Sequence, residues 1–179
     1  MNPIDHLLEE HTEFRRRMAG LGQAVAGLDS GGDAAWSAAL PVFRQFGEMM
    51  AGMLARHAAK EDDLLFPALE EAFGAQFPPA DVMRGEHRQI HAQGALFRTT
   101  LTELAERDHP AIVAGGEALR RLAAGSGGDR GAIRATAEEI LELMESHFTK
   151  EEQILFPMAR QMLDEAGLAA VGARMEAAE

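Results

Sequence analysis

The sequence HAAKEDDLLFP at residues 57–67 returns as HFTKEEQILFP at residues 147–157. Both copies read His-x-x-Lys-Glu, followed by two acidic or amide residues, two aliphatic residues and Phe-Pro. A helix advances about 100° per residue, so a His and a Glu four positions apart lie about 40° apart on one face. Each copy therefore presents an imidazole and a carboxylate in one direction, and two such helices facing each other would form a metal site.

The repeat extends upstream of these stretches. Glu10-His11 precedes the first copy in the same way that Glu86-His87 precedes the second. At 179 residues the chain has the length of one domain with its own core. We therefore expect a single domain over residues 1–179 with an internal repeat, roughly residues 1–75 and 78–165.

Apolar residues recur at three- and four-residue intervals through most of the chain, which is typical of amphipathic helices. The predicted helices run from Asn2-Pro3 to about Leu28, from Asp33 to Pro67, from about Ala80 onward and from Gly131 to Pro157, with a short tail helix after it. No stretch alternates strictly between apolar and polar residues, as a half-buried strand would. The pattern predicts an all-α fold, an up-down-up-down four-helix bundle with short loops.

The segments that connect these helices are rich in glycine and proline. We expect a turn at residues 29–33, a break at residues 108–110 and the clearest loop at residues 125–131. Pro67 lacks an N–H to donate, so it should kink or end the second helix.

Composition excludes several classes of function. A net charge of −12 is unsuited to nucleic acid, which needs a basic face. The absence of cysteine rules out disulfides, thiolate-ligated iron–sulfur centres and thiol catalysis. No apolar run reaches the length of a membrane span and no secretory leader is evident, so we expect a cytoplasmic protein without a membrane partner. The pattern leaves the oligomeric state open.

The candidate metal ligands are five histidines and two glutamates. His87 and His91 are four residues apart, so both rings can approach one ion. His11 matches His87 in its preceding Glu and its place in the repeat, where Arg15 occupies the position that corresponds to His91. The complete predicted set is His11, His57, Glu61, His87, His91, His147 and Glu151.

Other polar residues near these positions admit alternative roles. Asp62 and Glu152 lie five residues after a motif His, about 140° around the helix, and are rival carboxylates to the motif glutamates. Glu10 and Glu86 could orient neighbouring imidazoles or lie on a solvated face. His6 is expected in solvent. His109, beside a proline, is expected in a loop, outside the site.

Five imidazoles and two carboxylates are more than one ion needs, and they suit a pair of ions bridged by Glu61 and Glu151. Imidazole binds Fe, Zn, Cu or Ni, whereas bridging carboxylates favour a pair of Fe or Mn ions. The ferritin-like di-iron bundles use Glu-x-x-His and more carboxylates, so this ligand order is a different design.

The motifs His57-x-x-x-Glu61, His87-x-x-x-His91 and His147-x-x-x-Glu151, together with His11, resemble those of the hemerythrin-like (HHE cation-binding) family over nearly the whole chain. The resemblance implies an Fe–O–Fe type centre of two iron ions, with Mn or Zn as possible substitutes. One iron would be held by His87, His91 and His147, the other by His11 and His57, with Glu61 and Glu151 bridging.

Members of that family bind dioxygen, sense oxygen or iron, or handle nitric oxide and peroxide stress. In the oxygen-carrying members an Asp stands one residue further from the last motif His. Glu151 therefore counts against reversible oxygen carriage here and leaves Glu152 as an alternative bridge.

Three functions follow, in order of preference. The first is a di-iron binding protein that handles or senses dioxygen, nitric oxide or iron. The second is an enzyme of the oxidase or peroxidase type, acting on peroxide or nitric oxide at the same irons. The third is a metal-free structural bundle. Residue spacing does not decide between binding and turnover.

Overall fold

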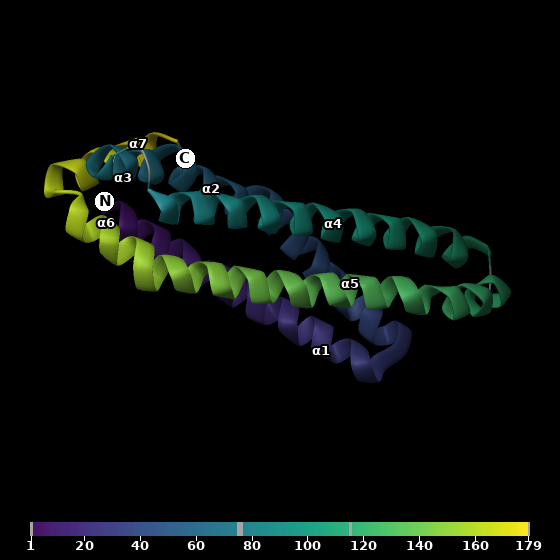
Figure 1. Cartoon of the computed structure of the whole chain (residues 1–179). Coiled ribbons are helices and arrows are strands. Elements are labelled where there is room, and N and C mark those ends of the chain that lie inside the picture. Colours follow the sequence, from purple (N-terminus) through teal and green to yellow (C-terminus); the bar gives the residue numbers. More distant parts are fainter. Residues whose placement is uncertain (1, 75–76, 115, 179) are drawn as a thin grey trace.

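The computed structural model describes residues 2–74, 77–114 and 116–178, apart from the side chains of residues 29–31 and 103–129. Every element assigned within these residues is helical, which confirms the all-α prediction (Figure 1). The α-helices are interrupted by three wide π-helical turns, named η1 to η3. In order the elements are α1 (Pro3–Met49), η1 (Met50–Leu54), α2 (Ala55–Lys60), η2 (Glu61–Leu65), α3 (Phe66–Phe73), α4 (Pro78–Ala114), α5 (Gly116–Lys150), η3 (Glu151–Leu155), α6 (Phe156–Met162) and α7 (Glu165–Ala177).

Helix α1 consists of two arms that meet at a sharp kink. Asn2 caps its first turn, with Oδ1 accepting from the backbone N–H of Ile4 at 2.9 Å. Gly32 has φ 54° and ψ −138°, a left-handed conformation that glycine adopts without a steric penalty. The turn predicted at residues 29–33 is confirmed by this kink, after which the chain returns along the molecule (Figure 1).

The second arm continues through η1, α2 and η2 into α3 with helical dihedrals at each junction. Pro67 therefore does not end the helix, and the wide turn before it explains why. The backbone N–H of Phe66 bonds to the carbonyl of Glu61, five residues back, and Phe156 bonds to Glu151 in the same way before Pro157. Both copies of the motif thus place a π-turn at the motif glutamate, a local geometry that is frequent at functional sites.

Helices α4 and α5 lie side by side for much of their length (Figure 1). Helix α4 begins at Pro78, two residues before the predicted start, and runs to Ala114, so the break predicted at residues 108–110 is wrong. The loop predicted at residues 125–131 is also wrong, because α5 contains these residues. Each glycine costs a helix about 1 kcal/mol, a preference that packing against a neighbouring helix can override.

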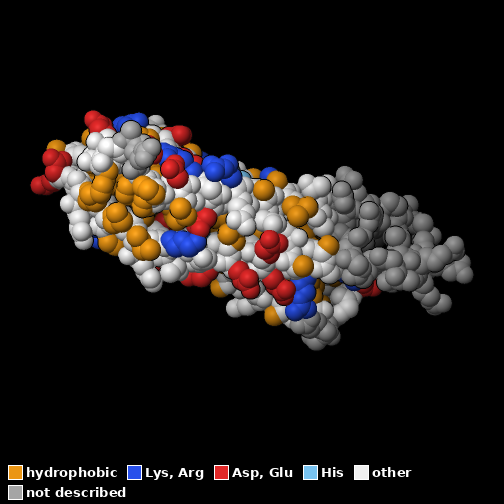
Figure 2. Space-filling model, in the orientation of Figure 1, with side chains coloured by type: hydrophobic (Ala, Val, Ile, Leu, Met, Phe, Trp, Pro, Cys, Tyr) orange, Lys and Arg blue, Asp and Glu red, His pale blue; other side chains and the backbone are white. Residues whose placement is uncertain are grey.

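The apolar core is divided in two along the long axis of the molecule. One cluster is centred on Phe14, Phe43, Phe97 and Phe148. The other lies toward the end formed by α3, α6 and α7, where apolar side chains also gather on the surface (Figure 2). Between the two clusters, each of the four long helical stretches carries buried polar residues. They are His11, His57, Glu61, His87, His147 and Glu151.

None of the helices in the described ranges has the length and apolar character needed to cross a lipid bilayer.

Candidate metal centre

Four buried histidines, one from each long helical stretch, converge between the two apolar clusters. They are His11 on α1, His57 on α2, His87 on α4 and His147 on α5, and none is more than 4% exposed. The rings of His11 and His57 lie 4.9 Å apart between centroids, and those of His87 and His147 lie 4.7 Å apart. In each pair, a His from an upstream Glu-His lies beside a motif His.

The outward nitrogens of the two motif histidines meet the glutamates that precede the other two. His57 Nδ1 lies 2.9 Å from Glu10 Oε2, and His147 Nδ1 lies 3.1 Å from Glu86 Oε2. A carboxylate accepts from the Nδ1–H, so each ring carries its proton outward and turns Nε2 inward. Of the two alternatives predicted for Glu10 and Glu86, orienting an imidazole is therefore the one that the structure shows.

Asp62 and Glu152, the rival carboxylates, have the same role toward the other two rings. His87 Nδ1 lies 2.9 Å from Asp62 Oδ1, and His11 Nδ1 lies 2.8 Å from Glu152 Oε1. Their offset of about 140° from the motif His directs them to a neighbouring helix. Glu152 also accepts from Arg15 Nη1 at 2.6 Å, so it is held outside the centre.

Glu151 lies between the two pairs of rings. Its Oε2 is 3.1 Å from His11 Nε2 and its Oε1 is 2.9 Å from His147 Nε2, and the side chain is fully buried. Ligand atoms of Glu151, His11 and His57 all lie within 4.8 Å of one another. Glu151, and not Glu152, therefore lies between the two pairs of inner rings.

Glu61 completes a second group, in which its ligand atom and those of His87, His147 and Glu151 lie within 4.8 Å of one another. Its Oε2 is 3.2 Å from His87 Nε2 and 3.7 Å from His57 Nε2. Like Glu151, Glu61 therefore faces one imidazole from each half of the chain.

The inner oxygen and nitrogen atoms of this cluster are better placed to bind a cation than to hydrogen-bond with one another. Both carboxylate oxygens of Glu61 and of Glu151 are buried without a hydrogen-bond partner, as are the Nε2 atoms of His87 and His147. Such groups cost about 1–3 kcal/mol each when unsatisfied. Carboxylate oxygens and Nε2 atoms are ligands that Fe, Mn and Zn accept, so the residues present fit a metal.

The contact between the remaining two rings points the same way. His11 Nε2 and His57 Nε2 lie 3.1 Å apart while both Nδ1 atoms face carboxylates. With both Nδ1–H groups directed outward, the two Nε2 lone pairs face each other, and a proton or a metal ion between them would relieve this contact.

The two central carboxylates differ in their pKa values. Burial and the charge of Glu151 raise the pKa of Glu61 above its usual range. Burial also opposes ionisation of Glu151, but the imidazoles of His11, His147 and His87 outweigh it and hold its pKa well below that range. Of the two carboxylates, Glu151 therefore gives up its proton more readily than Glu61.

The same carboxylates make His87 strongly basic. Burial lowers its pKa, but the hydrogen bond to Asp62 and the proximity of Glu151 and Glu61 raise it to about 11. A metal ion that binds Nε2 must therefore displace a proton.

His91 is the predicted ligand that the structure does not bring into either group. The buried stripe of α4 passes through Met83, His87, Ile90 and Phe97. His91 lies one turn after His87 but about 40° further round, beyond the edge of this stripe, and is exposed. The ligand role of His91 therefore stays a prediction, from a position outside both groups.

Aromatic rings separate the centre from bulk water. Phe148 stacks on His11 with ring centroids 4.2 Å apart, and Phe66 stacks on His87 at 6.0 Å. Both phenylalanines are fully buried.

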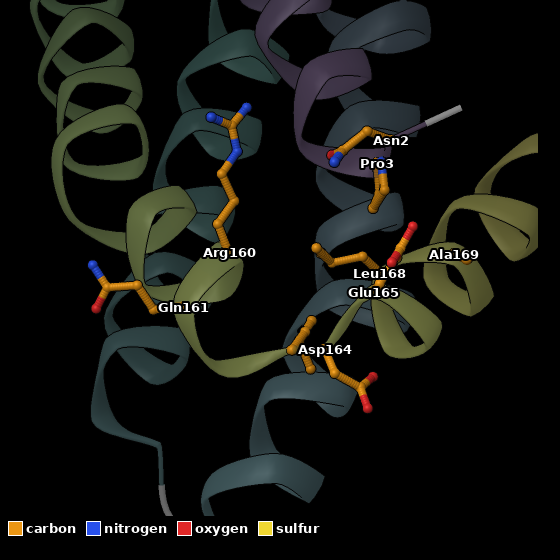
Figure 3. A pocket seen from close by; sticks show the side chains of 9 residues that line it. Asn2, Pro3, Arg160, Gln161, Asp164, Glu165, Leu168 and Ala169 are labelled. Atoms are coloured by element: carbon orange, nitrogen blue, oxygen red, sulfur yellow. The ribbon is translucent and has the colours of Figure 1, made fainter.

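A surface pocket of about 580 Å³ lies elsewhere, at the end of the molecule where α6 and α7 meet the N-terminus (Figure 3). None of the buried histidines or glutamates lines it. Its lining residues are Asn2, Pro3, Arg160, Gln161, Leu163, Asp164, Glu165, Leu168 and Ala169.

Residue spacing did not reveal the roles of His6 and Lys60. His6 was expected in solvent, but its Nε2 lies 2.7 Å from Lys60 Nζ. Lys60 belongs to the repeated His-x-x-Lys-Glu, so the signal was present in the motif. The side chain of His109 lies outside those that the structure describes.

Comparison with protein families identifies one match. The hemerythrin HHE cation-binding domain matches residues 2–108 and again residues 100–179. Neither the curated proteins nor the solved structures gave a match.

Proposed function

Because the chain belongs to the hemerythrin HHE cation-binding domain family, we propose that its buried cluster holds two iron ions and handles or senses a small diatomic molecule. The observation that carries the proposal is the pair of buried carboxylates without hydrogen-bond partners, Glu61 and Glu151, each facing imidazoles from both halves of the chain. The proposed ligands are His11 and His57 for one ion, His87 and His147 for the other, and Glu61 and Glu151 shared.

Two ions are favoured over one because the inner atoms form two groups with a common member. Glu151 belongs to both, while His11 and His87 belong to different groups. A shared carboxylate between imidazole-bound ions suits Fe or Mn, with Zn as a substitute.

The proposed architecture is a single up-down-up-down four-helix bundle with an internal repeat. The kink at Gly32 divides α1 into antiparallel arms, and the second arm, α4 and α5 supply the other stretches. Equivalent contacts in the two halves support the repeat, because the contact of Glu10 with His57 Nδ1 corresponds to that of Glu86 with His147 Nδ1.

Dioxygen or nitric oxide is the proposed ligand. Iron held by these residues would supply coordination of such molecules and one-electron chemistry. Two imidazoles for each ion, with His91 outside, leave room in the coordination sphere for a further ligand. Phe148 and Phe66 shield the centre from water and give it an apolar environment that suits a small uncharged molecule.

The test is to load the protein anaerobically with ferrous iron and record its absorption spectrum on adding dioxygen or nitric oxide. We expect a new band that saturates at a fixed ratio of ligand to protein. A spectrum unchanged by both gases would contradict the proposal. Sustained consumption of peroxide or nitric oxide, well above that of free iron, would instead favour the oxidase or peroxidase.

A further inference from the structure

Lys60 places a buried positive charge directly behind one of the inner histidines. Its side chain is 6% exposed, and Nζ donates to Glu10 Oε1 at 2.9 Å. The other oxygen of the same carboxylate accepts from His57 Nδ1 at 2.9 Å. His6 Nε2 accepts from the ammonium on another side, at 2.7 Å.

The repeat supplies a matched but more exposed copy of this arrangement. Lys150 donates to Glu86, whose other oxygen accepts from His147 Nδ1 at 3.1 Å. The side chain of Lys150 is 39% exposed, however, and the residue at the place of His6 is Val82, which is itself exposed.

We propose that Lys60 is a positioning residue that acts through Glu10 to hold His57 for metal binding, and that Lys150 has a weaker form of this role. The proposal rests on the proposed function, because it concerns the affinity of the same centre for its ions. It implies that the two ions, although their ligand sets are alike, depend unequally on the lysines.

The inequality follows from the burial of the two lysines, 6% exposed for Lys60 and 39% for Lys150, because their carboxylate partners are similarly exposed, 21% for Glu10 and 15% for Glu86. An ion pair at the surface contributes little, because water replaces either partner readily. Removing one partner of a buried pair leaves the other uncompensated, which costs much more. Without Lys60, the Glu10 carboxylate keeps His57 and the more distant His6, 3.6 Å from Oε1, but loses the ammonium that fixes it. The carboxylate can then turn toward solvent, and the His57 imidazole loses its fixed orientation.

The test is metal titration of the full chain with Co²⁺, which reports coordination through its visible absorption. Losing an outer partner of a metal-bound histidine typically costs about 10–100-fold in affinity. For Lys60→Met we expect a loss in that range for one of the two ions, and for Lys150→Met a smaller loss. Lys60→Arg, which keeps the cation, should restore most of the affinity.

The decisive comparison combines Glu10→Gln with a second substitution of the lysine, Lys60→Gln. Because glutamine keeps a polar side chain at this position, the comparison can still be made if Lys60→Met fails to fold. If Lys60 acts through Glu10, then Lys60→Gln should reduce Co²⁺ affinity in the natural background but have little further effect beside Glu10→Gln. Equal losses in both backgrounds, or unchanged affinity in Lys60→Gln, would overturn the inference. Failure of the unsubstituted protein to bind two ions would instead contradict the proposed function.

Discussion

The Glu151 carboxylate lies 3.1 Å from the His11 imidazole, measured from Oε2 to Nε2, although the two residues come from opposite ends of the chain. Both side chains are fully buried. The other oxygen of Glu151 lies 2.9 Å from His147 Nε2, so one carboxylate links the first helix to the last long one. The pair marks the centre, because both oxygens of this buried carboxylate face imidazole nitrogens and neither has a hydrogen-bond partner.

Exchanging His91 should leave the metal content unchanged. In His91→Ala we expect two ions per chain, since the exposed ring lies outside both groups of ligand atoms. In His87→Ala we expect one ion or none, because Nε2 is lost from the centre and Asp62 loses its partner. Elemental analysis of both variants after identical loading checks this. Loss of an ion in His91→Ala would contradict the ligand assignment.

Removing the metal should lower thermal stability. Unsatisfied inner atoms of Glu61, Glu151, His87 and His147 oppose folding in the metal-free protein. An ion that binds only the folded chain adds about 2.7 kcal/mol at a hundred times its dissociation constant. Calorimetric melting of the two forms should therefore give a higher Tm with metal. Equal Tm values would argue against a buried centre.

The metal-free protein should lose stability in acid through Glu10. Burial raises the pKa of Glu10, but the hydrogen bonds and charges of His57 and Lys60 lower it more, from 4.5 to about 2. The unfolded chain therefore binds this proton first, so the stabilisation is present above about pH 4.5 and disappears as the pH falls through about 2.

Glu10→Gln should accordingly be less stable than the unsubstituted chain at neutral pH, with the difference shrinking toward pH 2. Urea unfolding across this range measures it, with the exposed neighbour Glu9→Gln as the control. A difference that does not depend on pH would contradict the assignment to Glu10.

Replacing two helical glycines by alanine should change the free energy of unfolding in opposite directions. A Cβ at Gly94 would lie 2.9 Å from Met50 Cε and 3.3 Å from Met50 Cβ, so Gly94→Ala should cost about 1–3 kcal/mol through overpacking. A Cβ at Gly20 meets nothing within 4 Å, and Gly20→Ala should stabilise helix α1 by about 0.5–1 kcal/mol. The free energies of unfolding of the two variants should have opposite signs relative to the natural chain. A shift of the same sign in both would count against this packing.

The repeat made much of the centre predictable. Spacing pointed to Glu61 and Glu151, and the upstream Glu-His pairs pointed to Glu10 and Glu86 as either partners for imidazoles or acids on a solvated face. The contacts that spacing could not resolve depend on other helices. Asp62 reaches His87 across helices precisely because it lies off the face of its own motif, and a pattern within one helix does not say what a neighbour offers.

The errors and the open points have related physical causes. Helical periodicity locates a face only to within tens of degrees, which is too coarse to say whether His91 lies on the buried stripe of His87 or, as the structure places it, exposed beyond its edge. The glycines of residues 125–131 favoured a loop by composition, yet α5 includes them. Lys60 was read as part of a motif, but its burial depends on α1, where Glu10 and His6 meet it.

The most direct test of the central claim is the ratio of iron to protein after anaerobic loading with ferrous iron, measured by elemental analysis on untagged protein. Shared contacts of Glu61 and Glu151 with imidazoles from both halves predict two irons per chain. A ratio near zero, or one iron that does not rise with further loading, would contradict the paired centre.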